Sequence, residues 1–122
     1  MRPLKVYYAH PISLYGTPQE ERDLKLLEYL HPKAIIYNPA TDKGVEEGYK
    51  EKGMRYFYEI INHCDFLYFR AFPDLKIGAG VWGEIQHGVK ESCIVLELPI
   101  LLESRMLSIN DTREYLKQCG NR

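Results

Sequence analysis

The sequence contains few cysteines and no long apolar run. Its three cysteines, Cys64, Cys93 and Cys119, form no CxxC pair, and their odd number favours a reducing compartment over a disulfide framework. No stretch approaches the roughly 20 apolar residues of a membrane span, and the N-terminal residues lack the apolar core of a signal peptide. We therefore expect a cytoplasmic protein without membrane contacts, whose cysteines are small buried apolar residues.

Net charge of either sign is also nearly absent. Sixteen lysine and arginine residues stand against seventeen aspartate and glutamate residues. Because non-specific binding to nucleic acid requires a basic surface that displaces counterions, we expect no nucleic-acid polymer as partner. The four histidines show no HxH or HxxxH spacing, so we expect no metal centre.

Apolar segments alternate with amphipathic segments along the chain. Strands are expected at residues 4–9, 34–37, 66–69 and 93–98, which are nearly continuous in apolar and aromatic residues, as strands covered on both faces are. Helices are expected over 17–30, about 46–63, from about 80 onward and about 110–119. This alternation predicts a single α/β domain over residues 1–122. We expect a Rossmann- or flavodoxin-like three-layer sandwich, with a parallel sheet of four or five strands and helices on both faces.

Polar residues follow the expected strands at the edge where parallel sheets bind ligands. Ligands bind beyond the carboxyl ends of such strands, where the chain order reverses. His10 follows the first strand, Asn38 the second and Arg70 the third, and the segment leading to Glu84 comes next. Solvent exposure alone would explain any one of these residues, but their convergence at one edge predicts a small-molecule site.

The loop AHPISLYGTPQEE joins the first strand to a helix. Thr17 and Glu20 have the spacing of an N-cap and the acid of a capping box. Free backbone N–H groups and the helix dipole favour anions there, so Ser13, Gly16 and Thr17 could bind a phosphate. Alternatively, the loop is an ordinary turn in which Thr17 only caps its helix. The sequence has neither a GxGxxG fingerprint nor a P-loop lysine, and we expect no cofactor.

The segment GAGVWGEI places a single carboxylate, Glu84, after a run with almost no side-chain bulk. Glycines such as Gly80 let a ligand approach the backbone. The helix dipole favours an acid in the first turn and is expected to lower its pKa, which keeps a carboxylate nucleophile ionised. The dipole alone would explain the glutamate but not the missing bulk. Trp82 could stack on a planar ring, although a lone tryptophan is more often part of a core.

The segments VYYAHPI, CDFLYFR and above all GAGVWGEIQHG resemble the nucleoside 2-deoxyribosyltransferase superfamily, most closely its 2'-deoxynucleoside 5'-phosphate N-hydrolases. The resemblance covers the element order over about 4–98, and residue matches are confined to these segments. It implies that Glu84 attacks C1' of a (deoxy)nucleoside or its 5'-monophosphate and forms a covalent glycosyl-enzyme. It also implies that Tyr7 orients this carboxylate, and that a phosphate lies on the loop after the first strand.

Departures from the family pattern leave several activities open. Phe57 stands where the resemblance implies an aspartate that protonates the leaving base. Gly78 replaces an aspartate of the transferases, which weakens transfer more than hydrolysis. His10 could replace the lost acid, and Arg70 could pair with a phosphate. Hydrolysis, transfer and binding without catalysis therefore remain as alternatives, each with a nucleoside or nucleotide as the small-molecule partner.

The helix expected over 46–63 carries Tyr49, Tyr56 and Tyr58. Aromatic residues are common at protein interfaces, so we expect a homodimer that uses this helix. A domain that binds a protein partner and no small ligand is a further alternative.

Overall fold

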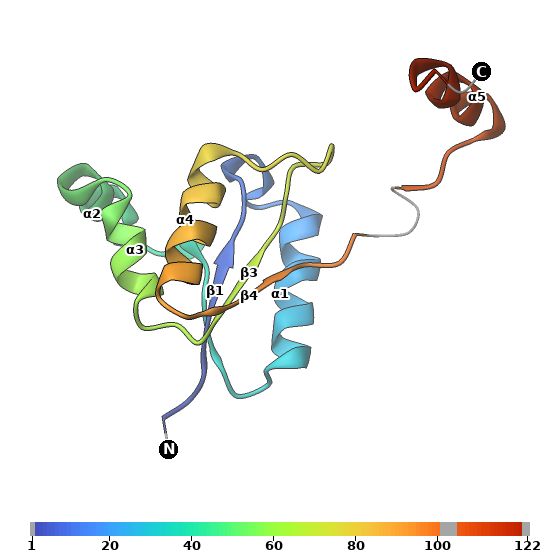
Figure 1. The fold of residues 1–122 in the computed structure, drawn as a ribbon. Coiled ribbons are helices and arrows are strands. Elements are labelled where there is room, and N and C mark those ends of the chain that lie inside the picture. The colour runs from blue at the N-terminus through green and yellow to red at the C-terminus, as the bar shows by residue number, and fades with distance from the viewer. Residues whose placement is uncertain (1, 101–104, 121–122) are drawn as a thin grey trace.

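The computed structural model of the chain describes residues 2–100 and 105–120. Within these residues, four parallel strands form one sheet in the order β2-β1-β3-β4 (Figure 1). The strands are β1 (Lys5–Ala9), β2 (Ile35–Tyr37), β3 (Phe66–Phe69) and β4 (Ile94–Glu97). The helices are α1 (Pro18–Leu30), α2 (Val45–Lys52), α3 (Arg55–Ile61), α4 (Ala79–Lys90) and α5 (Ile109–Gln118), with short 3-10 helices at Ile12–Leu14 and Pro39–Thr41. The predicted α/β sandwich is confirmed.

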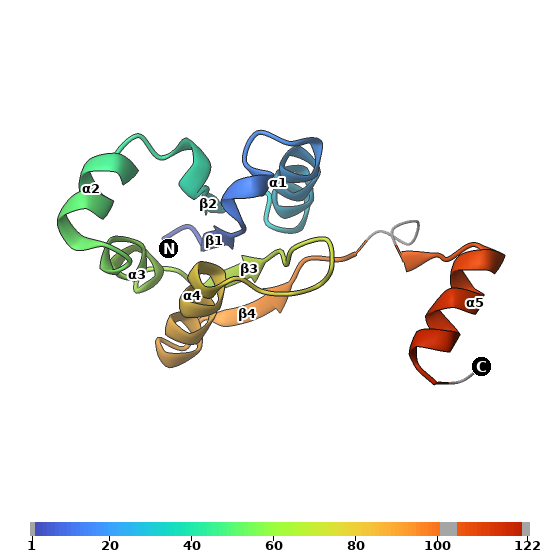
Figure 2. The ribbon, with the colours of Figure 1, turned by 90° about the horizontal axis from the view of Figure 1, so that it is seen from above.

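Side chains of β1 alternate between the two faces of the sheet, as the pleat of a strand requires. Val6 and Tyr8 pack with Leu27 of α1 on one face. Tyr7 packs with Ile61 of α3 and Ile85 of α4 on the other. Figure 2 shows α1 on one side of the sheet and α3 and α4 on the other. This alternation directs the ring of Tyr7 toward α4.

The helix predicted over 46–63 is divided into α2 and α3. Gly53 separates them with a φ of +62°, a left-handed conformation that glycine adopts without steric cost. Its N–H bonds to the carbonyl of Tyr49 at 2.7 Å and closes α2. The prediction of one continuous helix was wrong, because the apolar spacing of the sequence continues across the break.

All three tyrosines in this region contact other side chains of the chain, and the ring of Tyr49 lies against that of Phe57 with centroids 6.1 Å apart. The Tyr56 hydroxyl donates to the Asp42 carboxylate at 2.7 Å, and the Tyr58 ring stacks on His87 with centroids 4.7 Å apart. Tyr49 is half exposed. The homodimer stays a prediction.

The C-terminal helix α5 is capped by Ser108, whose Oγ accepts the N–H of Asp111 at 3.0 Å. Every residue of α5 is exposed. Cys64 and Cys93 are partly buried, whereas Cys119 is exposed, so the expectation of burial was wrong for Cys119. None of the described helices is both long and apolar enough to cross a bilayer.

Candidate active site

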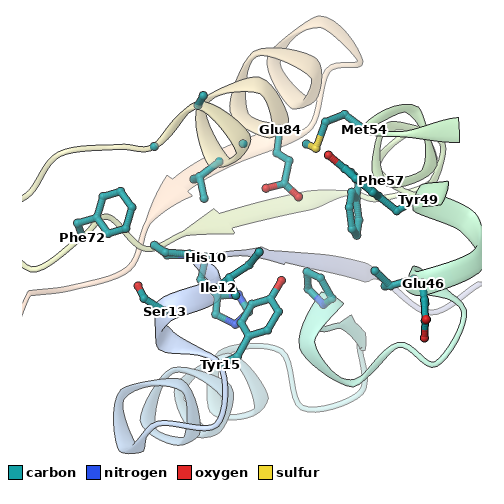
Figure 3. A pocket seen from close by; sticks show the side chains of 17 residues that line it. His10, Ile12, Ser13, Tyr15, Glu46, Tyr49, Met54, Phe57, Phe72 and Glu84 are labelled. Carbon is teal, nitrogen blue, oxygen red and sulfur yellow. The ribbon is translucent and has the colours of Figure 1, made fainter.

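A cavity of about 720 Å³ opens at the carboxyl edge of the sheet. It lies beside the point between β1 and β3 at which the strand order reverses, where open α/β sheets bind ligands. The loop after β1, helices α2 and α3, and the first half of α4 form its walls (Figure 3). The volume is typical of a small-molecule pocket. The carboxyl edge of the sheet, where the sequence predicts a small-molecule site, therefore contains a pocket of suitable size.

Glu84 projects from α4 into the wall of this pocket and is only 6% exposed. Its carboxylate accepts a hydrogen bond from the hydroxyl of Tyr7, which is fully buried. The Tyr7 ring is itself held by stacking on Tyr37 of the neighbouring strand, with centroids 5.2 Å apart. Strand alternation and packing thus fix the direction from which Tyr7 meets the acid.

Burial raises the pKa of Glu84 to about 7, and the hydrogen bond from Tyr7 opposes this shift only in part. The expectation that the helix dipole lowers this pKa was wrong. Glu84 lies in the second turn of α4, beyond the first turn where the dipole acts most strongly, and desolvation dominates. Burial and the adjacent carboxylate raise the pKa of the Tyr7 hydroxyl well above its usual range, so Tyr7 stays neutral and donates.

The glycines before Glu84 have different structural reasons. A Cβ on Gly83 would lie 2.4 Å from the Tyr58 hydroxyl, and a Cβ on Gly78 would lie 3.1 Å from the Phe72 ring. Both glycines therefore allow close packing of an aromatic residue. A Cβ on Gly80 would meet no atom within 4 Å, and Gly80 lines the pocket. The interpretation that glycine leaves room for a ligand applies to Gly80.

The loop after β1 is organised by the carboxylate of Glu20. The Thr17 hydroxyl accepts the N–H of Glu20 at 3.4 Å and donates to the Leu14 carbonyl at 2.6 Å, so the predicted N-cap is confirmed. The Glu20 carboxylate accepts the N–H of Gly16 at 3.1 Å and lies 2.7 Å from Nε2 of His10. Two donors expected to bind a phosphate are therefore already occupied: the Gly16 N–H by Glu20, and the Thr17 hydroxyl by the Leu14 carbonyl.

His10 lines the pocket, as expected, but both of its ring nitrogens are engaged inside the protein. Nε2 faces Glu20, and Nδ1 lies 3.2 Å from the carbonyl oxygen of Tyr8. The imidazole also stacks on the Tyr8 ring, with centroids 3.7 Å apart. This arrangement leaves neither nitrogen directed at a ligand, so it does not support His10 as a proton donor.

Arg70 is turned away from the pocket toward α1. Its guanidinium donates to the Asp23 carboxylate at 2.5 and 3.1 Å and to the Pro99 carbonyl at 2.7 Å. Asp23 is 2% exposed and also accepts the Tyr8 hydroxyl at 2.6 Å. This buried ion pair occupies the Arg70 guanidinium, which was expected to bind a phosphate.

The remaining predicted residues are divided between the pocket and its surroundings. Ser13 lines the pocket. The Asn38 side chain caps the short 3-10 helix at Pro39–Thr41 by accepting the Ala40 N–H at 3.0 Å. Trp82 is 50% exposed and lies outside the described lining, so the structure does not bring it to the site.

Comparison with family models and with curated proteins finds no match to this chain. Among the described residues, no three His, Cys, Asp or Glu side chains are grouped so that they could hold a metal ion.

Sequence reasoning missed Tyr15, which lines the pocket with its hydroxyl directed toward Glu84 (Figure 3). Burial, followed by the charges of Glu84 and Glu20, raises the pKa of Tyr15 to about 12. An aromatic residue beside a loop glycine, at a position where no sheet face needs it, was the available signal. The apolar wall was missed as well; it includes Val45, Tyr49, Met54 and Phe57.

Proposed function

We propose that the chain cleaves or transfers the N-glycosidic bond of a (deoxy)nucleoside or its 5'-monophosphate, with Glu84 as the nucleophile. The observation that carries this proposal is a buried carboxylate, oriented by Tyr7, in the wall of a pocket at the switch point of the sheet. A desolvated acid with a shifted pKa and a specific partner in a cleft is characteristic of functional sites. The resemblance described above points to the same two residues.

The reaction follows from the chemistry of a carboxylate facing an anomeric carbon. An oxygen of Glu84 bonds to C1', and the C1'–N bond breaks with its electron pair remaining on the base. Water then attacks C1' and releases the carboxylate, or a second base does so and completes a transfer. The carbon carries positive charge in both transition states. A buried carboxylate stabilises that charge strongly because little solvent screens the interaction.

The raised pKa of Glu84 places this nucleophile close to half ionised at pH 7. Tyr7 holds one of its oxygens, which leaves the other for the sugar. Because folding already fixes the orientation of the carboxylate, less entropy is lost on reaching the transition state.

Binding without catalysis is the second candidate function. Phe57 lines the pocket where the resemblance implies a proton donor, and its neighbours Tyr49 and Met54 make that wall apolar. A planar base packs well against such a wall, whether or not the bond to the sugar is broken.

The test is release of free base, measured by chromatography, from a panel of 2'-deoxynucleosides, ribonucleosides and their 5'-monophosphates. Glu84→Gln is expected to reduce release by at least about 10³-fold, because the amide cannot form the glycosyl-enzyme. Glu28→Gln is the matched control, since Glu28 is an exposed residue of α1 outside the pocket. A wild-type chain that releases no base from the whole panel would contradict the enzymatic proposal. Calorimetric binding of a panel member in that case would favour the second candidate.

A further inference from the structure

Tyr15 presents an uncommitted hydroxyl to the pocket. It follows the short 3-10 helix Ile12–Leu14, and its ring lies against His10 with centroids 4.9 Å apart. The hydroxyl points toward Glu84 (Figure 3). Within the described residues it makes no hydrogen bond, whereas the hydroxyls of Tyr7 and Tyr8 each bond to a carboxylate. The Tyr15 hydroxyl is therefore free to donate to a bound molecule.

Cleavage of an N-glycosidic bond requires a proton for most leaving bases. The departing nitrogen takes an electron pair, and a positioned acid that protonates the base contributes about 10²–10⁴-fold to the rate. Phe57 has no proton to give, and His10 directs both ring nitrogens at Glu20 and the Tyr8 carbonyl.

The other polar groups of the pocket are less well placed than Tyr15. Glu46 is exposed, and its carboxylate points away from Glu84 (Figure 3). Tyr49 is half exposed in α2. The Ser13 side chain is exposed, and a serine hydroxyl is a weak acid. Tyr15 is the half-buried hydroxyl that faces the nucleophile.

The charge of Glu84 controls how readily Tyr15 gives up its proton. Before reaction, burial and the charges of Glu84 and Glu20 raise the pKa of Tyr15 to about 12, so the phenol keeps its proton at neutral pH. When Glu84 forms an ester with C1', its negative charge disappears. The electrostatic contribution that held the proton on Tyr15 then falls at the moment when the base acquires its electron pair.

We propose that Tyr15 is the catalytic acid that protonates the leaving base, an inference that rests on the proposed function. In the first step, the Glu84 oxygen bonds to C1', the C1'–N bond breaks, and the Tyr15 proton moves to the base. In the second step, water attacks C1', its hydroxyl stays on the sugar, and its proton returns to the Tyr15 oxygen. Glu84 leaves as a carboxylate, and both residues regain their starting state.

The experiment compares Tyr15→Phe with wild type on leaving bases that differ in their need for a proton. The probes are 2'-deoxyadenosine, 2'-deoxyinosine and 7-methyl-2'-deoxyguanosine, each also as its 5'-monophosphate. The methylated base departs as a neutral molecule without protonation. Phenylalanine keeps the ring contact with His10 and removes only the hydroxyl. Tyr29→Phe is the control, because Tyr29 is an 81% exposed tyrosine of α1 outside the pocket.

Tyr15→Phe is expected to lower kcat by about 10²-fold or more for the two unmethylated nucleosides and less than about threefold for the methylated one. An equal loss for all three would show a structural role and overturn the inference, as would an unchanged kcat for all three. Release of base by wild type but not by Glu84→Gln keeps the proposed function in either case. If wild type releases no base from these probes or from the wider panel of nucleosides and 5'-monophosphates, the proposed function fails and this inference fails with it.

Discussion

Replacing Glu84 with glutamine is expected to stabilise the folded chain at pH 8 and to have little effect at pH 5. Glu84 has a pKa of about 7 in the folded chain against an ordinary value of 4.5. The folded state therefore holds a proton that the unfolded state releases as the pH rises from 4.5 to 7. The contribution of Glu84 to the free energy of unfolding of the wild type therefore falls across that pH range, and the fall is complete above pH 7.

The size of this effect follows from the shift in pKa. A difference of about 2.5 units at about 1.4 kcal/mol per unit corresponds to about 3 kcal/mol at pH 8, and to under about 1 kcal/mol at pH 5. Glutamine has nearly the same volume, does not ionise, and can still accept the hydroxyl of Tyr7. For a chain of this length, about 3 kcal/mol corresponds to a rise in Tm on the order of 10 °C.

The assay is thermal and urea denaturation at both pH values, followed by circular dichroism. Glu28→Gln serves as the control, and its effect is expected to stay within about 0.5 kcal/mol at either pH, as for most surface substitutions. The burial of Glu84 would be refuted by a stability difference between wild type and Glu84→Gln that is the same at pH 5 and pH 8. A variant that is less stable than wild type at pH 8 would refute it as well.

Three further predictions concern the pocket and its support. Since only ionised Glu84 attacks, kcat/KM is expected to rise about tenfold per pH unit up to about pH 7. Tyr7→Phe should shift this limb of the pH–rate profile to higher pH, because the lost hydrogen bond had lowered the pKa of Glu84. Gly80→Leu should abolish calorimetric binding of nucleosides without lowering Tm, since its side chain enters open space in the pocket; unchanged binding would contradict this. Asp23→Asn should destabilise the fold by about 3 kcal/mol in urea titrations, because the buried guanidinium of Arg70 loses its counter-ion; a loss below about 1 kcal/mol would argue against that pair.

Local patterns predicted most of the fold because they depend on neighbours in the chain. Apolar runs marked the four strands, and a threonine at an N-cap with an acid three residues later marked the start of α1. The break at Gly53 was missed, since a glycine within an apolar spacing does not reveal its φ angle. The exposed position of Cys119 was missed for a related reason: a spacing on a helix does not show whether another element covers that face.

The candidate site was predicted in part. The position of Glu84, its pairing with Tyr7 and the edge of the sheet came from strand periodicity, the glycine-rich segment and the family resemblance. Arg70 was expected to bind a phosphate, but its guanidinium pairs with a carboxylate of α1. Tyr15 was not predicted, because its place in the pocket depends on the conformation of the loop after β1.

The sequence by itself determined the alternation of strands and helices, the cap of α1 and the presence of one acid after a glycine-rich segment. These features follow from interactions within a few residues. The tertiary structure decided which charges are free and how strongly they hold their protons. Tyr7 and Glu84 are separated by 77 residues and Asp23 and Arg70 by 47, so burial and pairing arise only when the sheet brings distant segments together. Desolvation and hydrogen bonding act over a few ångströms, and folding sets those distances.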